Sequence, residues 1–214
     1  MSPNGRPFEI YSYNSSDGFD YVLEVIMKQA RLLTDAEMKR VFAVVAAGRN
    51  AERNRMILML GFLAGLRACS IAALKIGNVL NDAGNVKDEF VLLAAQTKGT
   101  KGQRVFLSGK LKKEIKSYVA TLKTFDPSLP LIQSQKRQQH FSSNSLVQLV
   151  NRIFQTAGID TSSHAMRRQF ITNLANNAVN PRVIQKLANH SSLNHTMSYI
   201  EISDRQLAAA VETL

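Results

Sequence analysis

The sequence predicts a mainly α-helical fold with a small antiparallel β-sheet, an α+β arrangement. Two long stretches, before residue 75 and after residue 108, place apolar residues three or four positions apart, the spacing of amphipathic helices. The stretch between them, 76–107, instead combines turn-forming residues with short apolar runs typical of strands. A chain of 214 residues can bury a sizeable core without disulfides.

We interpret residues 1–32 as a lead-in segment, because its first half is rich in turn-forming residues. Apolar spacing within it predicts a short helix at 21–31. The main domain is expected to run from residue 33 to residue 214.

The first helices of that domain have clear signals. Thr34 and Glu37 form a capping box for a helix that ends near Ala47. The next helix, 52–66, is apolar nearly all round, so we expect it at the centre of the core. A short helical stretch, 69–74, follows it.

Turn chemistry then predicts the sheet. Residues 81–84 are turn formers, and 90–95 form an apolar run of strand type. A glycine-punctuated turn at 97–102 precedes an alternating segment, 104–107. We expect two or three antiparallel strands with a lysine-bearing hairpin tip.

Helical periodicity returns after residue 108 and continues to the end of the chain. A loop at 125–141 interrupts it. The predicted helices are 110–122, 143–157, 164–178, 181–189 and 203–214.

The chain is strongly basic. Lys and Arg total 27 against 16 Asp and Glu, so the formal net charge is +11. Such an excess steers a protein towards a polyanion, first nucleic acid and second an anionic membrane. On charge alone, a basic surface that only aids solubility is an open alternative. The longest apolar stretch, 56–66, is too short to cross a bilayer, so we expect no membrane partner.

Cys69 is the single cysteine, which excludes a disulfide within the chain and fits a reducing compartment. The first thirteen residues lack the apolar core of a signal peptide. We therefore expect a cytoplasmic, nucleoid-associated protein. The histidines show no metal-ligand spacing and there is no phosphate-binding loop, so we expect no metal and no cofactor.

Three local patterns carry side chains suited to anion binding or nucleophilic attack. Arg67 stands between two helices, where rigid elements suit a group that grips a phosphate oxygen. His164 and Arg167, three apart on a helix, share one face. Tyr199 lies nine residues after His190. Taken singly, these residues fit a structural arginine, a core histidine or a core tyrosine about as well.

In combination and in this order, the patterns resemble the tyrosine recombinase (phage integrase) family over residues 33–214. The most specific part is SHAMRRQFITNLANNAVNPRVIQKLANHSSLNHTMSYIE, which is similar to the family's HxLRRTFAT…LGHSSxxTTxxYTH segment. The resemblance implies the family's catalytic-domain fold. It also implies a site-specific recombinase that cleaves and rejoins double-stranded DNA through a 3′-phosphotyrosyl intermediate, for integration, excision or inversion.

The resemblance implies catalytic roles for six residues, with Tyr199 as the nucleophile. The two arginines would hold the non-bridging phosphate oxygens, His190 would donate a hydrogen bond, and His164 would accept the phenol proton. Lys98, in the hairpin TKGTKGQR, would protonate the leaving 5′ oxygen, unless Lys101 takes that role. The set is Arg67, Lys98, His164, Arg167, His190 and Tyr199.

Basic residues near these patterns are candidates for DNA binding: Lys101, Arg104, Lys136, Arg137 and Arg168. The resemblance implies a homo-tetramer on DNA and a monomer or dimer without it. The last helix, 203–214, carries apolar residues at helical spacing. It either docks onto the next subunit or packs on its own domain.

Two departures from the family pattern support an alternative function. Ser70 stands where the family usually has a carboxylate. Only a short segment precedes Leu33, where most members carry a helical DNA-binding domain, so the chain is either a short member or part of a longer protein. The alternative is a catalytically weak, recombinase-derived protein that binds DNA and regulates. A type IB topoisomerase, which uses similar chemistry, matches the motifs less well.

Overall fold

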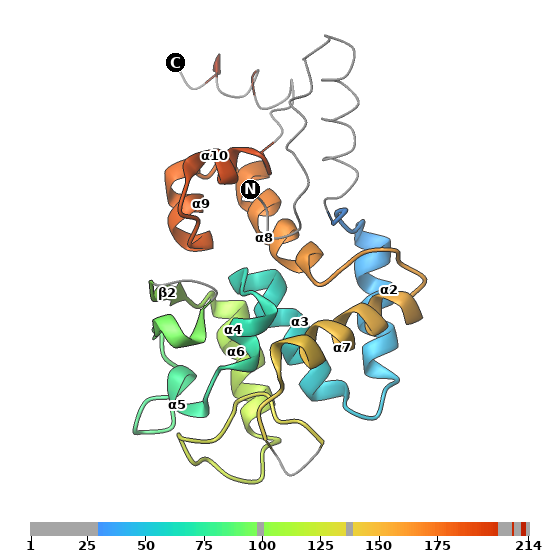
Figure 1. The fold of residues 1–214 in the computed structure, drawn as a ribbon, viewed down its shortest axis with the longest axis vertical. Coiled ribbons are helices and arrows are strands. Elements are labelled where there is room, and N and C mark those ends of the chain that lie inside the picture. Colours follow the sequence, from blue (N-terminus) through green and yellow to red (C-terminus); the bar gives the residue numbers. More distant parts are fainter. Residues whose placement is uncertain (1–29, 98–100, 136–138, 201–206, 208–210, 213–214) are drawn as a thin grey trace, which may run out of the picture. The chain divides into compact units, whose positions relative to one another are not determined.

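The computed structural model describes residues 30–97, 101–135, 139–200, 207 and 211–212 of the chain. The chain divides into two units, 1–30 and 31–214, and the described residues lie almost entirely in the second. The predicted lead-in and most of the predicted last helix, 203–214, fall outside the described residues. The described part is mainly helical with a two-stranded antiparallel sheet, which confirms the predicted fold class (Figure 1).

The helices follow the predicted order, and most of the anticipated ends are correct to within a few residues. Two short helices, α5 and α10, had no signal in the sequence, because four or five residues are too few to show a period. The helices are α2 (Asp35–Ala46), α3 (Ala51–Ala64), α4 (Ala68–Ala72), α5 (Ile76–Val79), α6 (Gly109–Val119), α7 (Ser143–Thr156), α8 (His164–Asn176), α9 (Pro181–Ala188) and α10 (Leu193–Met197).

Helix α2 begins at the predicted capping box. The Thr34 hydroxyl accepts a hydrogen bond from the Glu37 amide at 3.3 Å, and the Glu37 carboxylate accepts one from the Thr34 amide at 3.0 Å. The first four backbone amides of a helix have no partner within the helix. The capping box gives hydrogen-bond acceptors to two of them. The sequence signal was therefore sufficient to place this helix start.

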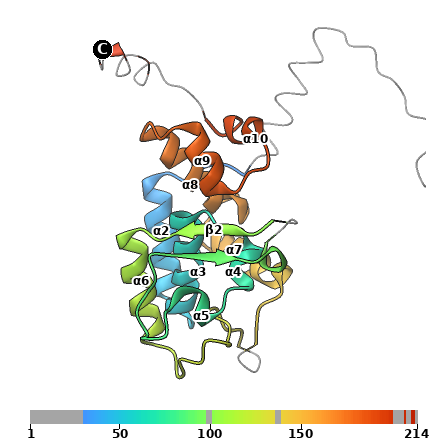
Figure 2. The same ribbon diagram turned by 90° about the vertical axis from the view of Figure 1, so that its left-hand side faces the viewer.

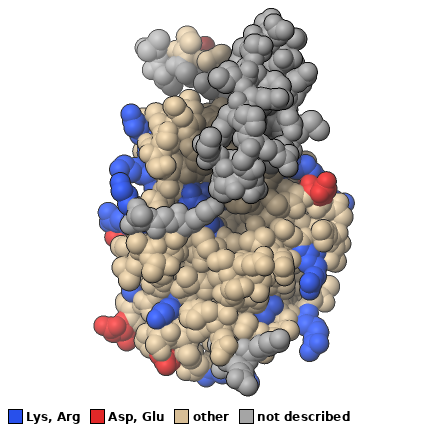
Figure 3. Space-filling view, viewed as in Figure 1, with Lys and Arg blue, Asp and Glu red and all other residues tan. Residues whose placement is uncertain are grey.

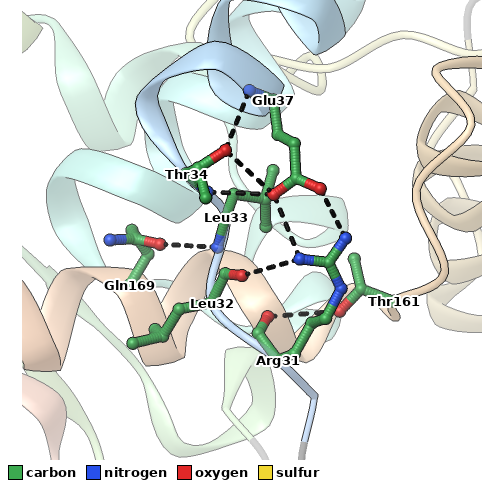
Figure 4. A network of polar contacts seen from close by, with 7 residues as sticks. All are labelled: Arg31, Leu32, Leu33, Thr34, Glu37, Thr161 and Gln169. Atoms are coloured by element: carbon green, nitrogen blue, oxygen red, sulfur yellow. Dashed lines mark hydrogen bonds and ion pairs between the residues drawn. The ribbon is translucent and has the colours of Figure 1, made fainter.

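A wider polar network fixes the same segment to the rest of the unit (Figure 4). Arg31 forms a bidentate ion pair with Glu37, and hydrogen bonding by Arg31 holds the pKa of Glu37 at about 2. The Leu33 amide donates to the Gln169 side chain of α8 at 3.0 Å, and the Thr161 hydroxyl donates to the Arg31 carbonyl at 3.3 Å. The start of the unit is therefore attached to α8, the helix that carries His164 and Arg167.

Helix α3 lies at the centre of the core, as predicted. The side chains from Met56 to Leu60 are all buried, and the helix contacts α2, α4, α6 and α8. A Cβ atom at Gly61 would lie 2.6 Å from Sδ of Met166 in α8. The glycine therefore permits α3 and α8 to approach closely, which brings the turn that carries Arg67 near the helix that carries Arg167.

The sheet pairs β1 (Glu89–Leu92) with β2 (Gln103–Phe106), and Phe90 stands opposite Val105. The predicted first strand, 90–95, extended too far. The chain leaves the strand at Leu93, whose amide donates to the Gln96 side chain at 3.1 Å and starts a 3₁₀ turn, η1 (Ala94–Gln96). A local side-chain cap thus overrides the apolar run.

The helices α8, α9 and α10 form a second, smaller core. Ile171, Ala175, Ile184 and Ala188 are buried together, and Tyr199 packs against them. Helix α9 contacts β2, so this cluster lies next to the hairpin (Figure 2). In the residues that the structure describes, no helix has the length and apolar character needed to span a membrane.

Candidate active site

The turn between α3 and α4 positions Arg67. Gly65 ends α3 in the left-handed conformation, with φ of 62°, and Arg67 is the extended residue that precedes α4. A Cβ atom on Gly65 would lie 2.4 Å from the Phe170 ring of α8, so glycine is required here for both conformation and space. The half-buried Arg67 side chain therefore starts from a rigid, closely packed turn.

Arg167 of α8 is buried and bonded to two helix ends. It donates from Nη1 to the Gly65 carbonyl at 2.7 Å and from Nη2 to the Ala188 carbonyl, the last residue of α9. Burial, followed by the nearby charge of Arg67, lowers the pKa of Arg167 to about 9, so it stays charged at neutral pH. A guanidinium has five N–H donors, which leaves donors for a ligand.

His190 follows α9 and is also buried. Asn189 closes that helix in the left-handed conformation and redirects the chain inward. The His190 Nδ1 atom lies 2.9 Å from the Thr196 hydroxyl, while Nε2 is enclosed and has no hydrogen-bond partner among the described residues. Burial, followed by the positive charge of Arg167, lowers the pKa of His190 to about 3, so the ring is neutral at neutral pH.

Tyr199 lies in the turn after α10, half-buried against the second core. Its ring stacks on His190 with centroids 5.8 Å apart and planes inclined by 25°. His195 lies edge-on to the Tyr199 ring, with centroids 5.4 Å apart, and it is 4.2 Å from the His190 ring. The three rings therefore form one cluster.

His195 was not among the predicted site residues. The signal available in the sequence was its spacing of four from Tyr199, which places two side chains on one side of a helical segment. Thr196, whose hydroxyl contacts His190, was also missed, since neither the hydroxyl nor its spacing distinguishes it from any other helical threonine.

The charge of the site is unbalanced. Elsewhere, some arginines are paired with carboxylates, as in Arg55–Glu114 and Arg104–Glu89. Within the described part of the chain, none of the ion pairs includes Arg67 or Arg167, and these two cations lie close enough to repel. Two adjacent guanidinium groups without a carboxylate form a binding site for an anion.

Of the other two predicted catalytic residues, the structure describes one. His164 is the first residue of α8, exposed, one turn before Arg167. Lys98 lies outside the described residues. Ser70, the departure from the family's carboxylate, is buried in α4.

The predicted DNA-binding residues do not form one described patch. Arg104 points outward from β2, pairs with Glu89 at 2.6 Å and lies over the Phe106 ring. Lys101 is exposed next to the hairpin, and Arg168 is half-buried in α8. Lys136 and Arg137 lie outside the described residues. Figure 3 shows basic side chains spread over the face it presents, with few acidic ones.

No group of three potential metal ligands from His, Cys, Asp and Glu occurs in the part of the chain that is described.

Comparison with known proteins places this arrangement in a family. The model of the phage integrase family matches residues 31–206. Among curated relatives, the tyrosine recombinase XerA of Thermococcus kodakarensis is 30% identical over 182 residues, covering 85% of this chain and 62% of the relative. XerA of Pyrococcus horikoshii is 29% identical over 180 residues, covering 84% of this chain and 60% of the relative. The chain thus spans about three fifths of their length.

The fold agrees with solved structures. A crystal structure of XerA recombinase has a TM-score of 0.66 at 22% identity and covers 86% of this chain and 64% of that protein. XerH bound to its palindromic difH substrate, in a post-cleavage complex, has a TM-score of 0.63 at 20% identity, covering 84% of this chain and 51% of that protein. The fold and the family model together define a tyrosine recombinase catalytic domain. The chain belongs to the phage integrase family.

Proposed function

We propose that this protein is a site-specific recombinase that cleaves and rejoins double-stranded DNA through a 3′-phosphotyrosyl bond to Tyr199. The observation that carries the proposal is that Arg67, Arg167, His190 and Tyr199, from four separate segments, form one cluster of unbalanced positive charge. The names of the relatives and the family membership support the same function.

Arg67 and Arg167 would hold the non-bridging oxygens of the scissile phosphate. Arg167 is suited to this because its two backbone contacts fix the guanidinium before DNA arrives. As the phosphorus becomes five-coordinate, negative charge grows on those oxygens, and two fixed cations stabilise it most in that state.

His190 would donate a further hydrogen bond from Nε2 while neutral. A neutral imidazole has a single N–H, so this role needs the proton on Nε2 and therefore a Thr196 hydroxyl that donates to Nδ1. The enclosed Nε2 atom without a partner among the described residues supports that assignment.

Tyr199 would attack phosphorus and displace the 5′ oxygen, without metal or nucleotide. A protonated phenol is a weak nucleophile, so the attack needs a proton acceptor. His164 is the acceptor that the sequence resemblance names, and Lys98, or else Lys101, is the acid for the leaving oxygen. The bond to tyrosine conserves the energy of the phosphodiester, so a 5′ hydroxyl of another strand can reverse the step.

We also propose the organisation around this chemistry. Residues 33–214 would be the catalytic domain and 1–32 a lead-in. The partner would be double-stranded DNA, with four copies assembled on it, in the cytoplasm at the nucleoid. XerH in complex with a palindromic substrate supports a DNA-bound assembly for a relative in fold.

The test is covalent capture on a nicked suicide duplex that carries the protein's own site. The wild type should give an adduct that survives denaturing electrophoresis, and Tyr199→Phe should give none while binding the duplex equally well. A wild type that binds the duplex but forms no adduct contradicts the proposal. That result would favour the alternative, a DNA-binding regulator that does not cut.

A further inference from the structure

His195 is the member of the ring cluster to which the chemistry above gives no task. Its imidazole is edge-on to the Tyr199 ring, with planes at 88° and centroids 5.4 Å apart, and it also contacts the His190 ring. The residue stands at the end of α10, four positions before Tyr199. The nucleophile therefore has a second histidine as its direct neighbour.

A proton acceptor for Tyr199 needs an accessible, neutral nitrogen. His190 is poorly suited, because Thr196 engages Nδ1, the proposed donor role keeps the proton on Nε2, and a pKa of about 3 makes the ring a weak base. His195 is exposed, so its side chain is accessible from solvent. Burial on its inner side, followed by Arg167 and then Arg67, lowers the pKa of His195 below its usual value and keeps the ring neutral at neutral pH.

We propose that His195 is a further catalytic residue and that His195, in place of His164, accepts the phenol proton of Tyr199 as Tyr199 attacks phosphorus and returns it during rejoining. The proposal rests on the proposed function. A ring separation of this size needs one side-chain rotation or one bridging water to make the transfer, and catalytic hydrogen bonds commonly tighten only when substrate is bound.

The step balances without a cofactor. The O–H bond of Tyr199 breaks, its proton goes to a His195 nitrogen, and the Oη–P bond forms as the P–O5′ bond breaks. The leaving oxygen takes a proton from the separate acid. In rejoining, a 5′ hydroxyl gives its proton to the deprotonated form of that acid, the P–O5′ bond forms as the P–Oη bond breaks, and the imidazolium of His195 returns its proton to the leaving oxygen of Tyr199.

Substrate binding would strengthen His195 as a base. The charged and titratable groups that face it are Arg67 from the start of α4, Arg167 from α8, His190 after α9, and Tyr199. The two arginines disfavour a charged imidazole until a phosphate anion neutralises them. The phosphate then favours the imidazolium that the reaction forms.

The experiment measures single-turnover adduct formation on the suicide duplex from pH 5 to pH 8 for the wild type, His195→Gln, His195→Phe and His164→Gln. Asn194→Ala, an exposed neighbour on α10, serves as the matched control and should keep the wild-type rate and profile. The wild-type rate should rise with pH through one inflection and then level off. His190, with its pKa of about 3, does not titrate in this range.

His195→Gln should lose that inflection and react at least ~100-fold more slowly at pH 7, the usual contribution of a general base. His195→Phe keeps an aromatic ring for packing but no nitrogen, and it should be equally slow. His164→Gln should keep the inflection. Duplex affinity should be unchanged in the His195 variants, since the base acts on the tyrosine and not on binding.

Three results would overturn the role of His195: a wild-type rate in His195→Gln, recovery in His195→Phe, or an inflection that disappears in His164→Gln instead. If His195→Gln does not fold, the wild-type profile decides: a wild-type rate without an inflection between pH 5 and pH 8 would also overturn the role of His195. A wild type that forms no adduct at any pH overturns the proposed function together with this role, whereas adduct formation that ignores His195 overturns this role alone.

Discussion

At the scale of single residues, Gly65 controls the position of both arginines. Its left-handed backbone starts the turn to Arg67, and its carbonyl accepts a hydrogen bond from Arg167. Gly65→Ala should cost about 1–2 kcal/mol for the backbone conformation alone. The clash with Phe170 should add to that cost and displace the carbonyl, so unfolding in urea and adduct formation should both be impaired.

Gly158→Ala is the matched control for this prediction. Gly158 also has a positive φ, of 67°, but an added Cβ would meet nothing within 4 Å. Gly158→Ala should therefore lower the free energy of unfolding only by the cost of the backbone conformation, and it should retain adduct formation. Equal effects in the two variants would show that the contact of Gly65 with Phe170 is unimportant.

The buried His190 should make stability depend on pH. Its pKa is about 3 in the folded protein against a usual 6.5, so the unfolded chain binds the proton first. The stabilising contribution is complete above pH 6.5 and is lost as pH falls towards 3. Between pH 7.5 and pH 5 the free energy of unfolding should drop by about 1–2 kcal/mol more in the wild type than in His190→Gln.

Urea unfolding of both proteins at the two pH values measures this difference. Glu37, whose pKa is held at about 2 by Arg31, is present in both proteins and cancels from the comparison. An identical drop in the two proteins would mean that His190 is not held neutral by the fold.

The sequence identified Tyr199 only through its distant partners, because nothing in its neighbourhood separates it from other tyrosines. Those partners were predicted from the order and spacing of the motifs in the family that the sequence resembles. The same order and spacing did not indicate His195, because the contact between His195 and Tyr199 arises from the end of a five-residue helix that has no periodic signal. The contacts that hold Arg167 were also unpredictable, since both acceptors are backbone carbonyls.

At the scale of elements, the first helices form where the local sequence pattern predicts them, whereas the sheet does not follow its pattern fully. Helix α3 followed its apolar composition and α2 its capping box, both strong patterns. The end of β1 did not follow its apolar run, because a hydrogen bond from the Leu93 amide to Gln96 turned the chain. The contact between the sheet and the second core could not be predicted from the sequence either, because β2 and α9 are far apart in the chain and meet only in the folded structure.

That attachment gives a prediction about the hairpin. Gln103 of β2 is buried and donates from Nε2 to the Leu187 carbonyl of α9 at 3.2 Å. Gln103→Leu should cost about 1–3 kcal/mol by leaving that carbonyl unpaired. Because the hairpin carries Lys98 and α9 leads to His190, adduct formation should also slow by more than the loss of folded protein explains.

Tyr118→Phe provides the comparison for Gln103→Leu. The Tyr118 hydroxyl of α6 is buried and donates to the Leu131 carbonyl at 3.0 Å, a bond that includes neither the hairpin nor α9. Tyr118→Phe should lower the free energy of unfolding similarly but leave the rate of adduct formation per folded molecule unchanged. Equal rates in both variants would exclude a role for Gln103 in aligning the hairpin.

At the scale of the whole molecule, the arginines that pair with carboxylates lie on the surface, whereas the two arginines of the candidate site do not pair with carboxylates among the described residues. The chain has a net charge of +11, yet several surface arginines are paired with carboxylates. Arg67 and Arg167, inside the site, have no such partner among the described residues. General attraction to DNA would therefore come from the whole surface, while the unpaired cations select one phosphate within the site.

The proposed assembly on DNA leads to a prediction about the end of the chain. Leu207 and Val211 stand one helical turn apart in spacing and are 56% and 66% exposed. If this segment docks onto a neighbouring subunit, the double variant Leu207→Ser, Val211→Ser should require at least about tenfold more protein for cooperative occupancy of a two-site duplex. Phe125→Ser should leave cooperativity intact, because Phe125 is similarly exposed, at 60%, but lies in the loop after α6.

Electrophoretic titration of one-site and two-site duplexes separates the cases. Affinity for a single site should be the same in the wild type, the double variant and Phe125→Ser. Unaltered cooperativity in the double variant would instead favour a segment that packs on its own domain.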